Sequence, residues 1–232
     1  MRPIGVVGAM DEEVNRLKAM MNVTKIEKKA MMEFFQGNLG GKEIVIVRSG
    51  IGKVNAAVGT QILIDDFQVS TVINTGVAGG LRNEINIGDI VISSDTLQHD
   101  MDATGFGYDL GVIPRMDQSV FLGDTTLIKK AKEICEKVNP DINTFVGRVV
   151  SGDQFISDSE KKKMILENFQ GYCTEMEGAA IGQTAFLNQV PFVLIRAISD
   201  KADHSAEMDY GEFEAKAIDH TVKLVTNLLE IL

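Results

Sequence analysis

Two glutamates separated by one residue stand in the sequence TEMEGAA at residues 174–180, between an apolar segment and a run of small residues. In an extended segment residues i and i+2 point to the same side, so Glu175 and Glu177 are predicted to face one place. Two buried like charges are unfavourable unless they are used, for example to hold a cis-diol, deprotonate a water or stabilise a cation formed in a reaction. The alternative is that both carboxylates mark a helix N-terminus, where the helix dipole favours negative charge.

Two further carboxylates follow apolar segments that are predicted to be buried strands. Glu13 comes after residues 4–8 and one turn before Leu17, on the side of a predicted helix that should be buried. Asp200 comes after the nearly continuous apolar run 191–197. Since α/β sheets bind ligands at the carboxyl ends of their strands, we expect Glu13, Glu177 and Asp200 to converge on one rim of the sheet. Asp11 and Glu12 are expected only to complement the dipole of their helix.

A site built from carboxylates alone favours one kind of chemistry. The sequence has no serine in a nucleophile elbow, no HExxH motif and no suggestive cysteine–histidine spacing. Reactions that pass through an oxocarbenium-like cation, such as glycoside cleavage, suit such a site. One group protonates the leaving group, another activates water, and the nearby negative charge stabilises the cation.

Small residues follow two of the predicted strands. Gly50 and Gly52 precede a predicted helix with Val54, Val58 and Ile62 on one face, which suggests that backbone approaches a ligand there. The GxxxxGK[ST] and GxGxxG spacings are absent and Ile51 makes the spot apolar, so a phosphate cradle is the weaker interpretation. Residues 76–81 follow a predicted strand at 69–75 and could let a flat ring lie against the backbone, although a tight turn alone would also explain them.

Residues 99–123 lack periodicity, and we predict a long loop that covers a site or lies at an interface. Within it, His99 and Asp100 could form a catalytic pair, but an internal hydrogen bond in a structural turn is the favoured interpretation.

The remaining pattern alternates strands with helices. Gly40 and Gly41 predict a hairpin turn between strands at 34–39 and 43–49. Further strands are predicted at 87–92, 144–151 and 172–175, and helices at 125–138, from 158 onward, at 178–189 and at 212–232. With no linker or repeat, residues 1–232 are predicted to form a single α/β domain with a mixed, mainly parallel central sheet flanked by helices.

Composition limits the partners and the compartment. The 232 residues include 23 Lys+Arg against 33 Asp+Glu, a formal charge of -10, which argues against nucleic acid and anionic membranes as partners. Cys135 and Cys173 have no CxxC spacing, so neither a metal cluster nor a disulfide is expected, and free thiols fit a reducing cytoplasm. There is no signal peptide pattern and no run of roughly 18 apolar residues, so we expect a soluble cytoplasmic protein.

Six blocks of the sequence resemble the 5′-methylthioadenosine/S-adenosylhomocysteine nucleosidase family. They are GAMDEE (8–13), SGIGKV (49–54), NTGVAGG (74–80), SGDQFI (151–156), EME (175–177) and RAISD (196–200). They occur in that family's order and cover essentially the whole chain. The resemblance implies a nucleoside-phosphorylase-like fold, a homodimer, and irreversible hydrolysis of the adenine–ribose bond of an adenine nucleoside, with no metal and no cofactor.

The same resemblance implies roles for five residues around the reacting bond. Glu13 would be the base that activates water, and Asp200 would give a proton to N7 of adenine. Glu177 would hold the ribose hydroxyls, Met176 would pack against the sugar, and Arg196 would orient carboxylates and water.

The rest of the implied site contacts the two ends of the substrate. Gly79 and Ile156 would line the purine site, Ile156 through its backbone, and Phe155 would stack on the base. The other implied substrate contacts are Met10, together with Ile51 and Tyr210 at the alkylthio group, and Ala103, Phe106 and Pro114 from the other subunit.

Two positions depart from the family pattern: Val77 stands where many members have serine, and Tyr210 where many have phenylalanine. These departures bear on substrate preference more than on reaction type. The sequence does not rank methylthioadenosine, adenosylhomocysteine, 5′-deoxyadenosine and aminodeoxyfutalosine as substrates, the last of which belongs to menaquinone synthesis. A purine nucleoside phosphorylase is the other alternative, and the role of Glu175 stays open.

Overall fold

The computed structural model describes residues 2–232, apart from the side chains of Glu207 and Glu212. Its centre is one mixed sheet with the strand order β10-β6-β8-β9-β5-β1-β4-β3-β2, in which β10 also pairs with β5 and β7 pairs with β6. The strands are β1 (Ile4–Gly8), β2 (Asn22–Lys29), β3 (Met32–Leu39), β4 (Lys42–Arg48), β5 (Thr71–Gly80), β6 (Ile90–Gln98), β7 (Phe121–Leu122), β8 (Thr144–Ser151), β9 (Cys173–Glu175) and β10 (Phe192–Asp200).

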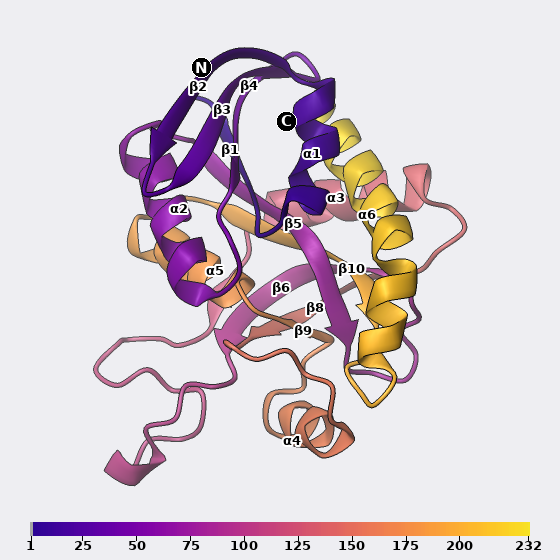
Figure 1. Ribbon diagram of the computed structural model, residues 1–232. Helices are drawn as coiled ribbons and strands as arrows, with labels where there is room; N and C mark the ends of the chain where they lie inside the picture. Colours follow the sequence, from indigo (N-terminus) through magenta and orange to yellow (C-terminus); the bar gives the residue numbers. More distant parts are fainter. Residues whose placement is uncertain (1) are drawn as a thin grey trace.

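Helices cover both faces of this sheet (Figure 1). They are α1 (Asp11–Met20), α2 (Lys53–Asp65), the short 3-10 helix η1 (Thr104–Phe106), α3 (Thr125–Val138), α4 (Ser159–Phe169), α5 (Gly178–Leu187) and α6 (Ala206–Ile231). Helices α1, α3 and α6 pack together on one face, and α2 packs against α5 on the other. Each face has its own hydrophobic cluster, so the single α/β domain expected from the sequence is confirmed. No helix in the described part of the chain is long and apolar enough to cross a membrane.

Parallel pairings join β1 to β4 and β5, β5 to β10, and β8 to β6 and β9. Antiparallel pairings join β10 to β6, β2 to β3, β3 to β4, β5 to β9 and β6 to β7. The mixed sheet is therefore confirmed, but antiparallel pairings among the described strands are as many as the parallel ones. Strand β5 is bordered by β1, β9 and β10, and this brings the carboxyl ends of β1, β5 and β10 close to β9.

Strand β5 runs through the glycine-rich residues that the sequence placed beyond its end. Gly76 pairs with Arg196 of β10, and Gly79 and Gly80 pair with Thr174 and Cys173 of β9. A Cβ at Gly79 would lie 2.7 Å from Oδ1 of Asp200. The small residues are thus strand residues that let neighbouring side chains approach the backbone, and the tight-turn alternative is wrong.

Helix α2 leaves much of its Val54, Val58 and Ile62 face exposed. Val54 and Val58 are 74% and 39% exposed, while Ala56, Gly59 and Leu63 are buried. The small side chains permit close packing, since a Cβ at Gly59 would already lie 3.3 Å from Met32 Sδ. An apolar surface is therefore left exposed on this helix.

Other boundaries differ less. The hairpin turn at Gly40 and Gly41 is confirmed, with both residues at positive φ, 61° and 77°. Strand β2, which the sequence analysis missed, is a largely exposed polar edge strand. Strand β10 extends to Asp200 itself, and α6 begins at Ala206, six residues earlier than predicted.

Candidate active site

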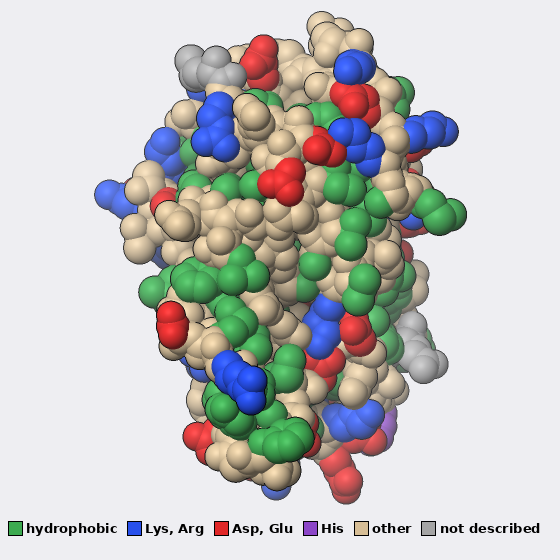
Figure 2. Space-filling model, turned by 90° about the vertical axis from the view of Figure 1, so that its left-hand side faces the viewer, with side chains coloured by type: hydrophobic (Ala, Val, Ile, Leu, Met, Phe, Trp, Pro, Cys, Tyr) green, Lys and Arg blue, Asp and Glu red, His purple; other side chains and the backbone are tan. Residues whose placement is uncertain are grey.

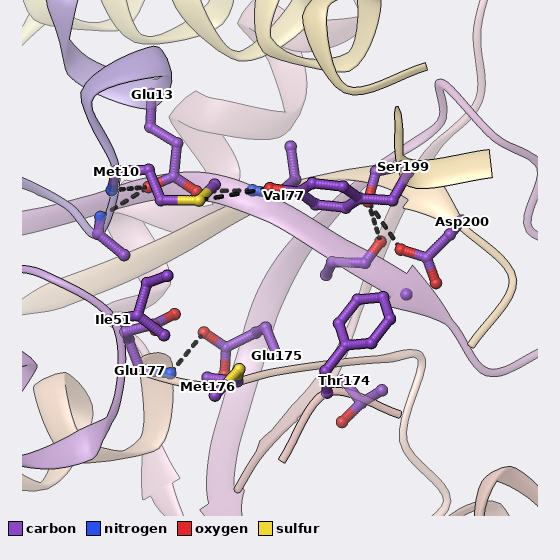
Figure 3. A pocket seen from close by; sticks show the side chains of 15 residues that line it. Met10, Glu13, Ile51, Val77, Thr174, Glu175, Met176, Glu177, Ser199 and Asp200 are labelled. Carbon is purple, nitrogen blue, oxygen red and sulfur yellow. Dashed lines mark hydrogen bonds between the residues drawn. The ribbon is translucent and has the colours of Figure 1, made fainter. Parts of the chain in front are cut away.

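A cavity of about 470 Å³ lies where β1, β5, β9 and β10 end, within the size range of small-molecule sites. Fifteen residues line it: Ala9, Met10, Glu13, Ile51, Val77, Ala78, Gly79, Phe155, Thr174, Glu175, Met176, Glu177, Ser199, Asp200 and Tyr210. Figure 3 shows Glu13, Glu177 and Asp200 around this one cavity. The three acidic residues, far apart in sequence, are thus brought together.

Glu13 is held by backbone N–H groups from two elements. Its Oε2 accepts hydrogen bonds from the N–H groups of Ala9 (2.6 Å) and Met10 (3.1 Å), and its Oε1 from that of Val77 (3.2 Å). Burial raises the pKa of Glu13, while the charge of Arg196 and these three N–H groups oppose the rise. The carboxylate is therefore fixed in position but retains basicity above that of a solvated glutamate.

Arg196 lies behind the cavity wall rather than in it, and is only 1% exposed. Its Nη2 forms an ion pair with the Glu175 carboxylate and donates to Oδ1 of Asn74. The absence of a side chain at Gly76 makes room for this guanidinium beside Glu13. Arg196 is thus the buried cation between carboxylates from two different elements.

Glu175 and Glu177 line the same cavity but have different partners. Glu175 accepts from Ser151 Oγ and from the N–H groups of Glu177 (3.1 Å) and Gly178 (2.7 Å), in addition to its ion pair with Arg196. The helix N-terminus alternative therefore describes Glu175 well, because its carboxylate binds the first N–H groups of α5.

Glu177 instead accepts from the N–H of Gly52, at 2.8 Å from Oε1. The backbone of the glycine pair at 50 and 52 therefore approaches a carboxylate. Burial and the charge of Glu175 raise the pKa of Glu177 to about 8, against the opposing effects of Arg196 and the Gly52 N–H. Its charge is thus easily lost at neutral pH unless a ligand stabilises it.

Asp200 is the last residue of β10 and has fewer stabilising partners. Its Oδ1 accepts from the N–H of Ala202 and its Oδ2 from Ser199 Oγ, both at 2.8 Å. Burial raises the pKa of Asp200, and the charges of Asp209 and Asp203 add to the rise, opposed by the two hydrogen bonds. Among the described side chains, none forms a salt bridge with it.

The other residues expected at the site fall into three groups. Gly79, Phe155, Met176, Met10, Ile51 and Tyr210 line the main cavity. Ile156 lies at an adjoining cavity of about 30 Å³ that shares Gly79, Phe155, Met176 and Asp200 with the main one. Ala103, Phe106 and Pro114 do not line the cavity of their own chain, and Phe106 is 88% exposed on the long segment 99–123.

The hydroxyl of Ser199, which donates a hydrogen bond to Asp200 from within the cavity, was not expected from the sequence. The signal available was its place directly before an acidic residue at a strand end. The prediction of an internal hydrogen bond between His99 and Asp100 is wrong. Asp100 accepts instead from Lys53 Nζ (2.6 Å) and from the N–H of Asp153 (2.9 Å). In the described part of the chain, no group of three or more His, Cys, Asp or Glu side chains is placed to hold a metal ion.

Comparison with known proteins places this site in a family. The model of the phosphorylase superfamily matches residues 3–230. A 5′-methylthioadenosine/S-adenosylhomocysteine nucleosidase of Exiguobacterium sp. is 43% identical over 223 residues, 96% of this chain and 95% of its own length. One from Staphylococcus epidermidis is 43% identical over 230 residues, 99% of this chain and 100% of its own. The chain belongs to the 5′-methylthioadenosine/S-adenosylhomocysteine nucleosidase family.

Solved structures agree with this nucleosidase assignment. The nucleosidase of Neisseria meningitidis in complex with methylthio-immucillin-A is 39% identical, with a TM-score of 0.95 over 100% of both chains. The nucleoside-phosphorylase-like fold implied by the six sequence blocks is therefore confirmed. Val77 and Tyr210, the two residues that depart from the nucleosidase pattern, both line the cavity.

Proposed function

We propose that this chain hydrolyses the N-glycosidic bond of 5′-methylthioadenosine and S-adenosylhomocysteine, and also of 5′-deoxyadenosine, releasing adenine and the thioribose (or 5-deoxyribose) in methionine salvage. The observation that carries the proposal is the gathering of Glu13, Glu177 and Asp200 in one cavity of nucleoside size. The names of relatives about 40% identical over the full chain support the substrate class.

The proposed reaction divides the proton transfers between two carboxylates. Glu13 takes a proton from water, whose oxygen bonds to C1′ of the ribose as the C1′–N9 bond breaks. The bonding electrons pass to the purine, and Asp200 donates its proton to N7, which makes adenine a neutral leaving group. Glu177 holds the ribose hydroxyls, and the negative charge around the sugar stabilises the oxocarbenium-like transition state. Met176 packs against the sugar, and Arg196 orients the carboxylates from behind the wall.

In this proposal the two ends of the substrate contact different residues of the cavity. The purine lies by Gly79 and stacks on Phe155, with the backbone of Ile156 at its edge. The 5′ substituent lies by Met10, Ile51 and Tyr210.

A purine nucleoside phosphorylase is the second candidate, because the superfamily model also describes phosphorylases. Binding of phosphate needs clustered cationic or amide donors. Of the described side chains that line the cavity, none is Lys or Arg, and Ile51 stands in the glycine loop. We therefore expect equal rates of adenine release with and without phosphate, and a strict requirement for phosphate would overturn the hydrolase assignment.

Hydrolysis of aminodeoxyfutalosine is less favoured. Relatives named 5′-methylthioadenosine/S-adenosylhomocysteine nucleosidase reach 43% identity over nearly the whole chain, whereas a solved structure of futalosine hydrolase from Helicobacter pylori is 31% identical to it. Measuring kcat/KM for methylthioadenosine, adenosylhomocysteine, 5′-deoxyadenosine and aminodeoxyfutalosine tests the ranking directly.

The proposal includes a cytoplasmic homodimer. Figure 2 shows hydrophobic side chains gathered on one face of the molecule. On the elements α2, α5 and the segment 99–123, the exposed apolar residues are Val54, Val58, Phe106, Leu122, Phe186 and Leu187. A second copy seated there would bury this surface and bring Ala103, Phe106 and Pro114 toward a cavity they do not reach in their own chain. Sedimentation equilibrium tests it: a monomer at micromolar concentration would contradict the dimer.

A further inference from the structure

Tyr210 brings a hydroxyl group to the part of the cavity wall where the apolar side chains of Met10 and Ile51 lie. All three residues line the cavity, and the Tyr210 hydroxyl lies 3.3 Å from Sδ of Met10. The ring of Tyr210 also meets the ring of Phe155 edge to face, with 6.0 Å between the centroids. Its position in the cavity is therefore set by α6 on one side and by the 152–156 turn on the other.

The hydroxyl of Tyr210 is committed to one partner. It lies 2.7 Å from Oε1 of Glu214, one turn further along α6, and 3.3 Å from Sδ of Met10. A hydroxyl has one proton to donate, and a carboxylate is a much stronger acceptor than a thioether sulfur. The proton therefore points to Glu214, and the lone pairs of the phenol oxygen stay free beside Met10.

The charges around this hydroxyl keep it protonated, so that its oxygen can accept a hydrogen bond from a ligand. Burial and the hydrogen bond and charge of Glu214 raise the pKa of Tyr210, and the charges of Glu13 and Glu12 add to the rise. The phenol consequently stays neutral and keeps donating to Glu214. An acceptor oxygen backed by a carboxylate attracts an N–H or O–H donor, and attracts a cationic one most.

We propose that Tyr210, polarised by Glu214, is a specificity-determining acceptor for the 5′ substituent, and that it selects aminoalkyl thioethers over plain alkyl thioethers of equal length. This inference rests on the proposed function, which places the 5′ substituent at this part of the cavity wall. Tyr210 would contact the substrate, and Glu214 acts through Tyr210 as a positioning residue.

Two isosteric substrates test the inference. We would measure kcat/KM for 5′-(3-aminopropylthio)-5′-deoxyadenosine and 5′-butylthio-5′-deoxyadenosine, which differ by an ammonium in place of a methyl group. The ratio of the two values is expected to fall about tenfold in Tyr210→Phe, as for loss of one hydrogen bond to a charged group. It should fall a few-fold in Glu214→Gln, whose amide still accepts the hydroxyl proton but carries no charge. Because each ratio is taken within one protein, the fraction that folds cancels.

The matched control is Glu230→Gln, an exposed residue in the last turn of the same helix, for which the ratio should not change. An unchanged ratio in either Tyr210→Phe or Glu214→Gln overturns the inference while the proposed hydrolysis stands. Failure of the wild-type protein to cleave either substrate, or methylthioadenosine, would overturn the proposed function and this inference with it.

Discussion

The two ends of the cavity hold buried carboxylates in opposite electrostatic settings. Glu13 has three backbone N–H donors and the buried cation Arg196 near it. Asp200 has one N–H, one hydroxyl and two like charges in its surroundings. Burial raises both pKa values, but the cation and the three N–H groups oppose the rise at Glu13, whereas the two like charges add to it at Asp200.

This difference supports the proton-transfer roles that we propose for Glu13 and Asp200. Two carboxyl groups whose environments favour opposite protonation states can act as base and acid at the same pH. Glu13, beside Arg196, would therefore receive the proton of water, and Asp200 would supply the proton to adenine.

The largest effect is expected from removing the cation. Arg196→Met leaves the charge of Glu175 buried without its partner, and such losses cost about 3–5 kcal/mol. Urea denaturation of the variant should show this fall in the free energy of unfolding. The matched control is Lys163→Met, which removes the exposed Lys163–Glu167 pair and should cost less than about 1 kcal/mol. Equal losses of unfolding free energy in the two variants would show that the buried Arg196–Glu175 pair stabilises the fold no more than an exposed pair does.

Changing the acid or the base comes next. Asp200→Asn and Glu13→Gln should each lower kcat at least about 10²-fold, because neither amide can exchange the required proton. A substrate analogue should still bind both variants in calorimetry. Asp141→Asn, at an exposed position, is the control and should keep full activity. Retained turnover in Asp200→Asn would remove this residue as the acid.

The pH dependence of kcat/KM should report the titration of Glu13 and of Asp200. Activity is expected to fall at low pH as Glu13 is protonated and at high pH as Asp200 loses its proton. Since both pKa values are raised, each limb should lie above the ordinary range of its residue type. The residual activity of Glu13→Gln should lack the acid limb, and that of Asp200→Asn the alkaline limb. The opposite pattern would exchange their roles.

The smallest effect is expected from removing the buried carboxyl group of Glu177. A carboxyl group whose pKa is raised on folding stabilises the fold only while it is protonated, and this contribution is lost as pH rises from the unfolded value, 4.5, through the folded value of about 8. Glu177→Gln removes the cost of the buried charge and should raise Tm by roughly 2–4 °C at pH 9. At pH 4 the variant and the wild type should melt alike. A variant that melts lower at pH 9 would contradict the raised pKa.

The fold was predictable where local signals agree. Helix α3 begins and ends where the sequence predicts, because Asp124 caps it, its apolar residues follow the helical period and Pro140 lies beyond it. Strand β2 has mostly exposed polar residues and no alternation, so nothing local marks it. The buried face of α2 depends on how closely α5 and the sheet approach its small residues, and the apolar pattern of the helix does not specify this.

The sequence indicated which residues form the site, but not which groups those residues bind. Strand ends and apolar flanks indicated Glu13, Glu177 and Asp200. The sequence could not separate Glu175 from Glu177, because the difference lies in Arg196, which arrives from β10, and in Gly52, which arrives from the turn before α2. Such pairings depend on the order of strands in the sheet, which no local pattern specifies.

The central claim is that Asp200 supplies the proton to adenine and Glu13 takes one from water, so the reaction requires the protonated form of Asp200 and the ionised form of Glu13. Infrared difference spectra at the pH of highest activity between the wild type and the Asp200→Asn and Glu13→Gln variants test it most directly. The account predicts that Asp200→Asn loses a protonated-carboxyl band and that Glu13→Gln loses a carboxylate band. Loss of a carboxylate band in Asp200→Asn would contradict it.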